Sequence, residues 1–168
     1  SQVQFSHQGG VTEPLTLSLT GAGPGELIRF TLDATEPTVN SVPALQPITI
    51  SNTKVVRAKI FRAGYLSAPS SSRSYLIGVD HELPVVSLIT EPNNFFHPDT
   101  GMYVLGAGYS GNFPYFGSNI WEEWERPLHF SLYEEDGSLG TELNVGVKIF
   151  GNYSRAQPLR SLSLFARS

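Results

Sequence analysis

Hydrophobic and polar residues alternate with a period of two along most of the chain, and this period predicts β-strands rather than helices. In the first half the alternating runs cover residues 15–20, 28–33 and 56–60, where apolar side chains take every second position. Turn-forming residues bound each run, for example the Gly-Ala-Gly-Pro-Gly segment at residues 21–25. Short strands with one apolar face each are typical of a small β-sandwich.

The composition of the sequence changes after a linker-like segment at residues 78–82. Beyond it, aromatic residues become dense and the stretches of turn-forming residues become longer. This change predicts a domain boundary near residue 80, with one domain at residues 1–79 and a second at residues 80–168. The whole chain is therefore expected to be all-β, a sandwich followed by a mostly antiparallel sheet segment.

The second half contains five expected strands and a single expected turn of helix. An Asp136-Gly137 pair between the third and fourth strands is a hairpin-type turn signal. A loop rich in Gly, Asn, Phe and Tyr occupies residues 106–119. The expected strands cover residues 85–89, 102–105, 128–132, 143–149 and 161–164, and the helical turn covers residues 120–124.

The last strand pattern is still alternating when the chain ends. Leu162 and Leu164 alternate with serines only a few residues before Ser168. From this pattern we expect the chain to be a fragment of a longer protein. An edge strand with unpaired backbone groups is then expected near this end, and such an edge pairs readily with another chain.

Composition narrows the classes of function. The net charge is −4 and no basic patch is visible, so nucleic acid and anionic lipid surfaces are not expected as partners. The chain has no cysteine, which excludes disulfides, thiolate metal sites and cysteine nucleophiles. No apolar run approaches the ~20 residues that a membrane helix needs, and the chain opens on polar sequence without a signal peptide.

One segment carries a resemblance to a known accessory domain. It is Ile28–Thr38, with the letters IRFTLDATEPT, supported by Phe5–Gly10 and by the Gly-Tyr-Leu-Ser segment at residues 64–67. These segments resemble the C-terminal accessory domain of chitobiases and β-hexosaminidases, in which the corresponding letters typically read YTLDGSEPT. The resemblance covers residues 5–76 and implies an immunoglobulin-like β-sandwich; Ala34 stands where the family usually has Gly.

A second resemblance covers residues 83–168. Its strongest segments are Gly146–Arg155, with the letters GVKIFGNYSR, and Arg160–Ser168, with the letters RSLSLFARS. They are similar to the beginning of the CotH kinase-like family of secreted bacterial proteins. The chain is then expected to hold the N-terminal part of such a domain, and the protein to be secreted or attached to a bacterial cell surface.

The CotH resemblance implies a nucleotide-phosphate site. Its members would be Gly151, Asn152, Ser154 and Arg155 in one turn, with Arg160 on the following strand. Backbone N–H groups in a tight turn and a guanidinium fork both suit phosphate oxygens. ATP and Mg²⁺ are the cofactors implied for a full-length parent, whereas none is expected for this chain.

The same turn has a purely structural alternative, a β-turn that carries a structural arginine. Arg160 stands where many active CotH members have Lys, and Tyr153 where many have a small Ser. Phosphoryl transfer also needs carboxylates that hold Mg²⁺, and the family supplies these further along the chain. We therefore expect no catalytic residue in this chain and no activity, even if the parent protein is a kinase.

Trp121 and Trp124 are the candidates for binding a sugar by ring stacking. They are three residues apart, so a helical turn would place them on one side. The neighbouring loop adds further aromatic residues, which suggests a carbohydrate-binding surface. Packing of the loop against a core is the alternative.

Other chemistry-bearing residues are expected to be structural. The cluster Glu122–Arg126 contains two adjacent carboxylates, which point apart on a helical turn, and the Asp99–Gly101 triplet of aspartic proteases lacks its usual apolar flank. The four histidines have no spacing that suits zinc, so no metal site is expected. Asn93, Asn94 and Asp99 have oxygen ligands for Ca²⁺, but they are also ordinary turn residues.

The leading hypothesis is therefore non-catalytic. The first domain would be an accessory or spacer sandwich, and the second the start of a CotH-like domain. A secreted phosphotransferase as the parent protein and a carbohydrate-binding module are the two alternatives. Carbohydrate or a cell-surface protein is the expected partner.

Overall fold

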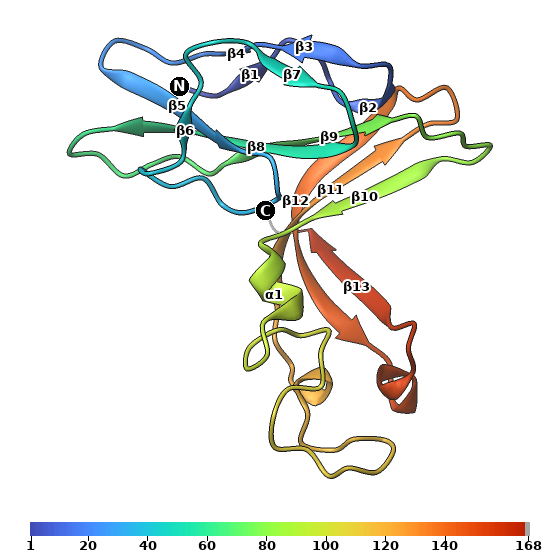
Figure 1. Ribbon diagram of the computed structural model, residues 1–168. Coiled ribbons are helices and arrows are strands. Elements are labelled where there is room, and N and C mark those ends of the chain that lie inside the picture. Colours follow the sequence, from blue (N-terminus) through green and yellow to red (C-terminus); the bar gives the residue numbers. More distant parts are fainter. Residues whose placement is uncertain (167–168) are drawn as a thin grey trace. The chain divides into compact units, whose positions relative to one another are not determined.

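The structure is a computed structural model that describes residues 1–166, and strands dominate it (Figure 1). This confirms the all-β expectation. The strands of the first half are β1 (Gln4–Phe5), β2 (Gly10–Thr12), β3 (Leu15–Leu17), β4 (Leu19–Thr20), β5 (Glu26–Thr31), β6 (Val42–Pro43), β7 (Ile48–Ile50), β8 (Lys54–Arg62) and β9 (Ser71–Ile77). The later elements are β10 (Val85–Ile89), α1 (Pro92–Phe96), the 3-10 helix η1 (Asn119–Trp121), β11 (Arg126–Tyr133), β12 (Leu139–Phe150), the 3-10 helix η2 (Tyr153–Ala156) and β13 (Ser161–Ala166).

Two compact units make up the described chain. Unit 1 contains residues 1–89 and 131–142, and unit 2 contains residues 90–130 and 143–166. Strands β11 and β12 therefore each contribute residues to both units. The domain limits 1–79 and 80–168 stay a prediction.

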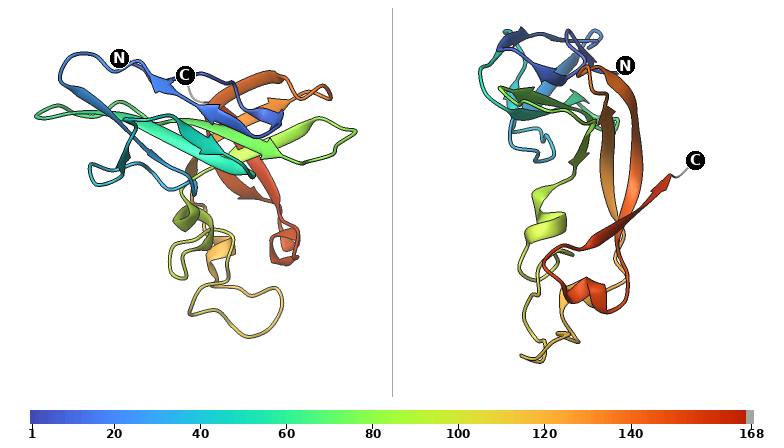
Figure 2. Two further views of the ribbon diagram at one scale, coloured as in Figure 1. Left: turned by 45° about the horizontal axis from the view of Figure 1, so that its top comes forward. Right: turned by 90° about the vertical axis from the view of Figure 1, so that its right-hand side faces the viewer.

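Unit 1 is built as two layers of strands (Figure 2). One layer is a five-stranded sheet with the order β2-β9-β8-β5-β6, in which only the β2–β9 pair is parallel. The other layer consists of the two-stranded pairs β1–β4 and β3–β7. Apolar side chains from both layers meet between them and form the core of a sandwich.

The period-two pattern of the sequence explains which side chains enter this core. In β8, Val56, Ala58 and Ile60 are buried, whereas the residues between them are only half-buried. On the facing layer, Leu17 of β3 and Ile50 of β7 are buried against the same core. The alternation predicted at residues 56–60 is thus confirmed, because each buried residue lies two positions from the next.

The run at residues 15–20 does not form the single strand that its alternation predicts. It divides into β3, which pairs with β7, and β4, which pairs with β1. The exchange of partners falls at Ser18, whose backbone N–H donates to Ser6 Oγ at 2.9 Å and whose carbonyl accepts from Ser6 N at 3.0 Å. A period-two pattern reports which face a residue lies on, but it does not report which strand is the partner.

The turn end of the β11–β12 hairpin is part of unit 1. Tyr133 is fully buried there, and its hydroxyl donates to the carbonyl of Ser74 at 3.4 Å. Glycine is needed opposite this ring, because a Cβ on Gly10 would lie 3.0 Å from the Tyr133 ring and 2.4 Å from a backbone oxygen. An ion pair of 2.6 Å between Arg73 and Glu142 adds a second link. The turn at Asp136-Gly137 itself forms as predicted.

Unit 2 has a smaller apolar core between paired strands and irregular loops. Strands β12 and β13 pair antiparallel, from Val145 opposite Ala166 to Phe150 opposite Ser161. This pairing confirms the strand expected at residues 161–164. The buried core residues are Met102, Ile120, Leu128, Val145, Val147, Ile149 and Ala156.

Two expectations for unit 2 were wrong. Residues 102–105 form no strand, because the backbone N–H groups of Met102 and Tyr103 donate to carbonyls at the helix α1 instead. The helical turn expected at residues 120–124 is the shorter η1, which ends at Trp121, where extended backbone begins at Glu122. Residues 102 and 103 thus pair with α1, and residues 121 and 122 with the residues three positions before them.

Candidate functional site

The signature segment of unit 1 follows β5 as an irregular loop. The carboxylate of Asp33 accepts hydrogen bonds from the backbone N–H of Thr35 at 3.1 Å and from its hydroxyl at 2.6 Å. Between them, Ala34 has a φ of 65°, in the left-handed region that favours glycine. This is the position at which the related family usually has Gly, so Ala34 carries backbone strain that a glycine would not.

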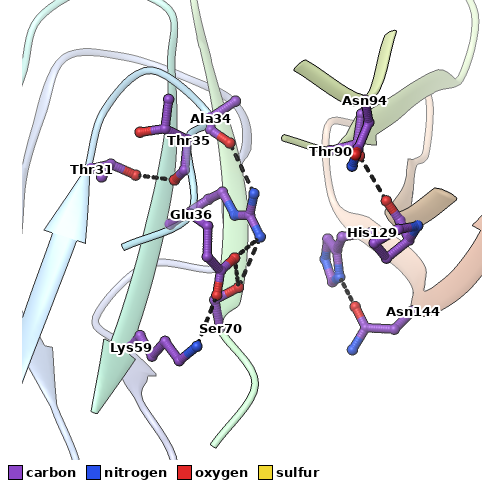
Figure 3. Close-up of polar contacts among 12 residues, drawn as sticks. Thr31, Ala34, Thr35, Glu36, Lys59, Ser70, Thr90, Asn94, His129 and Asn144 are labelled. Carbon is purple, nitrogen blue, oxygen red and sulfur yellow. Dashed lines mark hydrogen bonds and ion pairs between the residues drawn. The ribbon is translucent and has the colours of Figure 1, made fainter. Parts of the chain in front are cut away.

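Glu36 is the centre of a polar network that holds this loop against β8 (Figure 3). Its carboxylate accepts hydrogen bonds from Lys59 at 3.1 Å and from the Ser70 hydroxyl at 2.8 Å, and it forms an ion pair with Arg57. The Arg57 guanidinium also donates to the carbonyl of Ala34 at 2.9 Å and to Ser70 Oγ at 2.9 Å. The loop is thereby linked to two strand-borne cations and to the segment before β9.

The electrostatics of Glu36 fit a structural role. Partial burial by itself raises the pKa of this carboxyl. Hydrogen bonds from Ser70 and Lys59 and the charges of Arg57 and Lys59 outweigh that effect and hold the pKa below its ordinary value. A carboxylate with a lowered pKa stays ionised at neutral pH and is a poor general acid. The network therefore keeps Glu36 ionised and links the loop to β8.

The predicted phosphate turn lies in unit 2, between β12 and η2. Gly151 has a φ of 116°, and a Cβ there would lie 2.1 Å from the Ser154 hydroxyl, so the turn requires glycine. Arg155 folds back over it: Nε donates to the Gly151 carbonyl at 2.8 Å, and Nη1 donates to the Trp121 carbonyl at 3.5 Å. Nη2 forms an ion pair of 2.8 Å with Glu123. The three nitrogens of this guanidinium all have protein partners.

Arg160 is held in the same way. Its Nε donates to the carbonyl of Arg155 at 2.7 Å, and its Nη1 donates to the carbonyl of Tyr103 at 3.2 Å. The guanidinium lies over the Tyr103 ring, 4.9 Å from its centroid, and the Tyr103 hydroxyl accepts from the backbone N–H of Arg160 at 3.1 Å. The structure thus brings Gly151, Arg155 and Arg160 together, but it directs both guanidinium groups to main-chain carbonyls.

An open depression of about 540 Å³ lies beside this turn, between β12 and β13. Lys148, Phe150 and Asn152 line it, together with Ser163 and Phe165 of β13. The sequence predictions missed Lys148. Its position in the alternation of β12 was a signal, because a lysine between buried Val147 and Ile149 must point to the opposite face.

Trp121 and Trp124 do not form one platform. The Trp121 indole N–H donates to the carbonyl of Pro114 at 2.8 Å, and the ring packs on Phe116 at a centroid separation of 4.9 Å. Trp124 lies under the Arg126 guanidinium, 4.9 Å from the ring centroid. Both rings are partly buried against the core of unit 2, and the extended backbone after Trp121 places them in different surroundings.

A larger group of rings gathers around Trp121, and we call it the aromatic cluster. Phe113 and Tyr153 stack at a centroid separation of 6.4 Å and an interplanar angle of 25°, and Phe116 contacts Tyr153 at 6.3 Å. Phe113, Phe116 and Tyr153 are 54%, 53% and 56% exposed. The cluster consists of Tyr109, Phe113, Tyr115, Phe116, Trp121 and Tyr153. Tyr153 was not predicted as a member of the cluster.

The remaining sequence candidates lie in local polar contacts. The Asn94 amide donates to the Thr90 hydroxyl at 2.8 Å, and Thr90 donates to the Pro127 carbonyl at 2.7 Å (Figure 3). His129 Nδ1 lies 2.9 Å from Asn144 Oδ1. Nowhere in residues 1–166 do three His, Asp or Glu side chains gather closely enough to hold a metal ion. No helix in that range has the length and apolar character needed to cross a bilayer.

Unit 1 is therefore a β-sandwich, and the residues of its signature segment stabilise its own loops. Residues 7–72, which lie in this unit, match the family model described as Chitobiase/beta-hexosaminidase C-terminal domain. The match spans less than half of the chain, so it assigns a family to this segment alone. No curated protein and no solved structure matches the chain. The resemblance of residues 83–168 to the CotH family stays a prediction.

Proposed function

We propose that the chain is a non-catalytic part of a secreted bacterial surface protein, an accessory sandwich joined to a CotH-like segment. The family match of residues 7–72 to an accessory domain supports the first half of this proposal. The Glu36 network supports it as well, because the carboxylate of the signature loop bonds to Arg57, Lys59 and Ser70 of the same unit. In this role unit 1 acts as a spacer that carries the following segment.

The arrangement of Arg155 and Arg160 is the single observation that carries the absence of catalysis. A phosphate-binding arginine presents its N–H fork to the ligand. Here Arg155 donates to two main-chain carbonyls and pairs with Glu123, and Arg160 donates to two further carbonyls. The residues present therefore do not fit the phosphates of ATP, and no step of phosphoryl transfer is assigned to them.

A phosphotransferase assay tests this proposal. Purified protein is incubated with radiolabelled ATP, Mg²⁺ and a general acceptor such as casein, beside an Arg155→Lys/Arg160→Lys variant. We expect equal, background incorporation by both proteins. Incorporation by the wild type that is lost in the variant would establish a working phosphate site and overturn the proposal.

A further inference from the structure

The loop 106–119 and η2 present the aromatic cluster on a surface that nothing in unit 2 covers. Phe113, Phe116 and Tyr153 are each more than half exposed, although burying a large aromatic ring is favourable. Exposed rings grouped in one patch mark a site of interaction. The chemistry around the rings then indicates what the patch binds.

The loop that supplies most of the rings is uncharged. Residues 106–119 contain no Asp, Glu, Lys, Arg or His, and the side chains other than rings are small or carry hydroxyl and amide groups. Arg155, whose guanidinium donates to the Trp121 carbonyl, forms an ion pair of 2.8 Å with Glu123. An anionic or cationic ligand finds no complementary charge on the loop 106–119 itself. A neutral ligand with apolar faces and hydroxyl groups finds both of its partners.

Phe113 and Tyr153 offer apolar ring surface to a ligand, because more than half of each residue is exposed. Phe113 and Tyr153 are inclined by only 25° to one another and belong to two different segments, the loop and η2. Each follows an exposed asparagine, Asn112 or Asn152, whose amide can donate to and accept from hydroxyl groups. The C–H face of a pyranose ring can pack on an aromatic ring while its hydroxyl groups bond to amides. The exposed rings and the exposed asparagines provide both kinds of group.

The loop is also held in place before any ligand arrives. The buried Asn119 donates its amide to the carbonyls of Pro98 and Gly101, both at 3.1 Å, and fixes the base of the loop. Trp121 donates its indole N–H to the Pro114 carbonyl and contacts the rings of Phe116 and Tyr153. A preformed site loses less conformational entropy on binding.

From these observations we propose that the aromatic cluster binds a neutral polysaccharide, with Phe113 and Tyr153 stacking on sugar rings and Asn112 and Asn152 bonding to their hydroxyls. The inference goes beyond the accessory role proposed above, and it concerns unit 2 rather than the family-matched sandwich. It also moves the sugar-stacking role from the Trp121–Trp124 pair to the exposed rings, while Trp121 becomes their support.

Affinity electrophoresis tests the proposal with the full chain in gels that contain barley β-glucan, xyloglucan or arabinoxylan, and binding to insoluble chitin and cellulose completes the panel. The test variant is Phe113→Leu/Tyr153→Leu, which keeps an apolar surface but removes the flat rings. Its matched control is Phe96→Leu, an aromatic residue of the same unit that is 62% exposed and lies outside the cluster. A gel with anionic alginate is the ligand control.

We expect the wild type to bind at least one neutral polysaccharide and not alginate, and the double variant to bind it about tenfold more weakly. The control variant should bind as the wild type does. If the double variant does not fold, Tyr153→Ser, which introduces the residue common in the CotH family, should weaken binding in the same direction. Failure to bind any neutral polysaccharide, or equal binding by the double variant, overturns the proposal; equal binding would indicate an apolar protein-docking surface. These outcomes are independent of the phosphotransferase assay.

Discussion

The signature loop of unit 1 and the turn at Gly151 in unit 2 are both irregular, yet they are held by different chemistry. In unit 1 a carboxylate, two cations and a hydroxyl bond to one another around Glu36. In unit 2 the arginines bond to backbone carbonyls, and the rings beside them stay exposed. The loop of unit 1 is thus held by charged and hydroxyl side chains, whereas the turn of unit 2 is held by main-chain carbonyls and leaves neighbouring rings exposed.

Of the changes considered for the two regions, removal of the Arg57 side chain is expected to lower the free energy of unfolding most. Arg57→Ala deletes bonds to Ala34, Glu36 and Ser70 and leaves Glu36 partly buried with fewer partners. We expect the free energy of unfolding to fall by about 2–3 kcal/mol, measured by urea denaturation. Arg62→Ala, on the exposed end of the same strand, is the control and should cost less than about 1 kcal/mol. Equal losses of stability for both variants would show that the Glu36 network does not contribute to the stability of unit 1.

The second prediction concerns Arg160→Lys, which introduces the residue that many active CotH members carry. A lysine has no guanidinium fork and cannot reach the carbonyls of Arg155 and Tyr103 in the same geometry. We expect a loss of about 1–2 kcal/mol in thermal or urea unfolding and no gain in nucleotide binding. An undiminished stability together with new ATP binding would show that Arg160 is a ligand-binding residue rather than a structural one.

Relief of strain at Ala34 is expected to have a smaller effect, and of opposite sign. Ala34→Gly removes the Cβ that opposes a φ of 65°, and the greater freedom of glycine in the unfolded chain offsets part of the gain. We expect a stabilisation of about 0.5–1 kcal/mol. Ala22→Gly, in an exposed loop, lacks a positive φ and should destabilise slightly. A destabilising Ala34→Gly would contradict the strain.

The smallest expected effect is on the pH dependence of stability. The folded-state pKa of Glu36 lies below its ordinary value, so its contribution is complete above the unfolded pKa of about 4.3 and is lost as the pH falls through the folded pKa. Wild-type stability should therefore fall more steeply below about pH 5 than that of Glu36→Gln. Parallel curves from urea unfolding at pH 3–7 would show that Glu36 has no lowered pKa.

Much of unit 1 follows from its sequence, because the period of the apolar residues determines which face of a strand is buried. Val56, Ala58 and Ile60 illustrate this, and so does the turn at Asp136-Gly137. The exchange of partners at Ser18 and the burial of Tyr133 in unit 1 depend on contacts between distant segments, for which period and propensity carry no signal. Strand faces are thus predictable here, whereas strand partners are not.

The candidate site of unit 2 was predictable only in part. The sequence pattern at residues 146–155 predicted a turn at Gly151, and the structure has a turn there that needs glycine. Arg155 and Arg160 lie close to this turn. The direction of their guanidinium groups depends on carbonyls of Trp121 and Tyr103, which are far away in the sequence. The same holds for Tyr153, whose ring meets the loop 106–119 only after folding.

A titration with Mg·ATP tests most directly whether the Gly151 turn has a structural role or binds a nucleotide. Trp121 is the reporter, because its carbonyl accepts from Arg155 and its ring lies 6.4 Å from that of Tyr153, centroid to centroid. We expect no saturable change in tryptophan fluorescence up to millimolar Mg·ATP. A saturable change that disappears in Arg155→Gln would contradict the structural role.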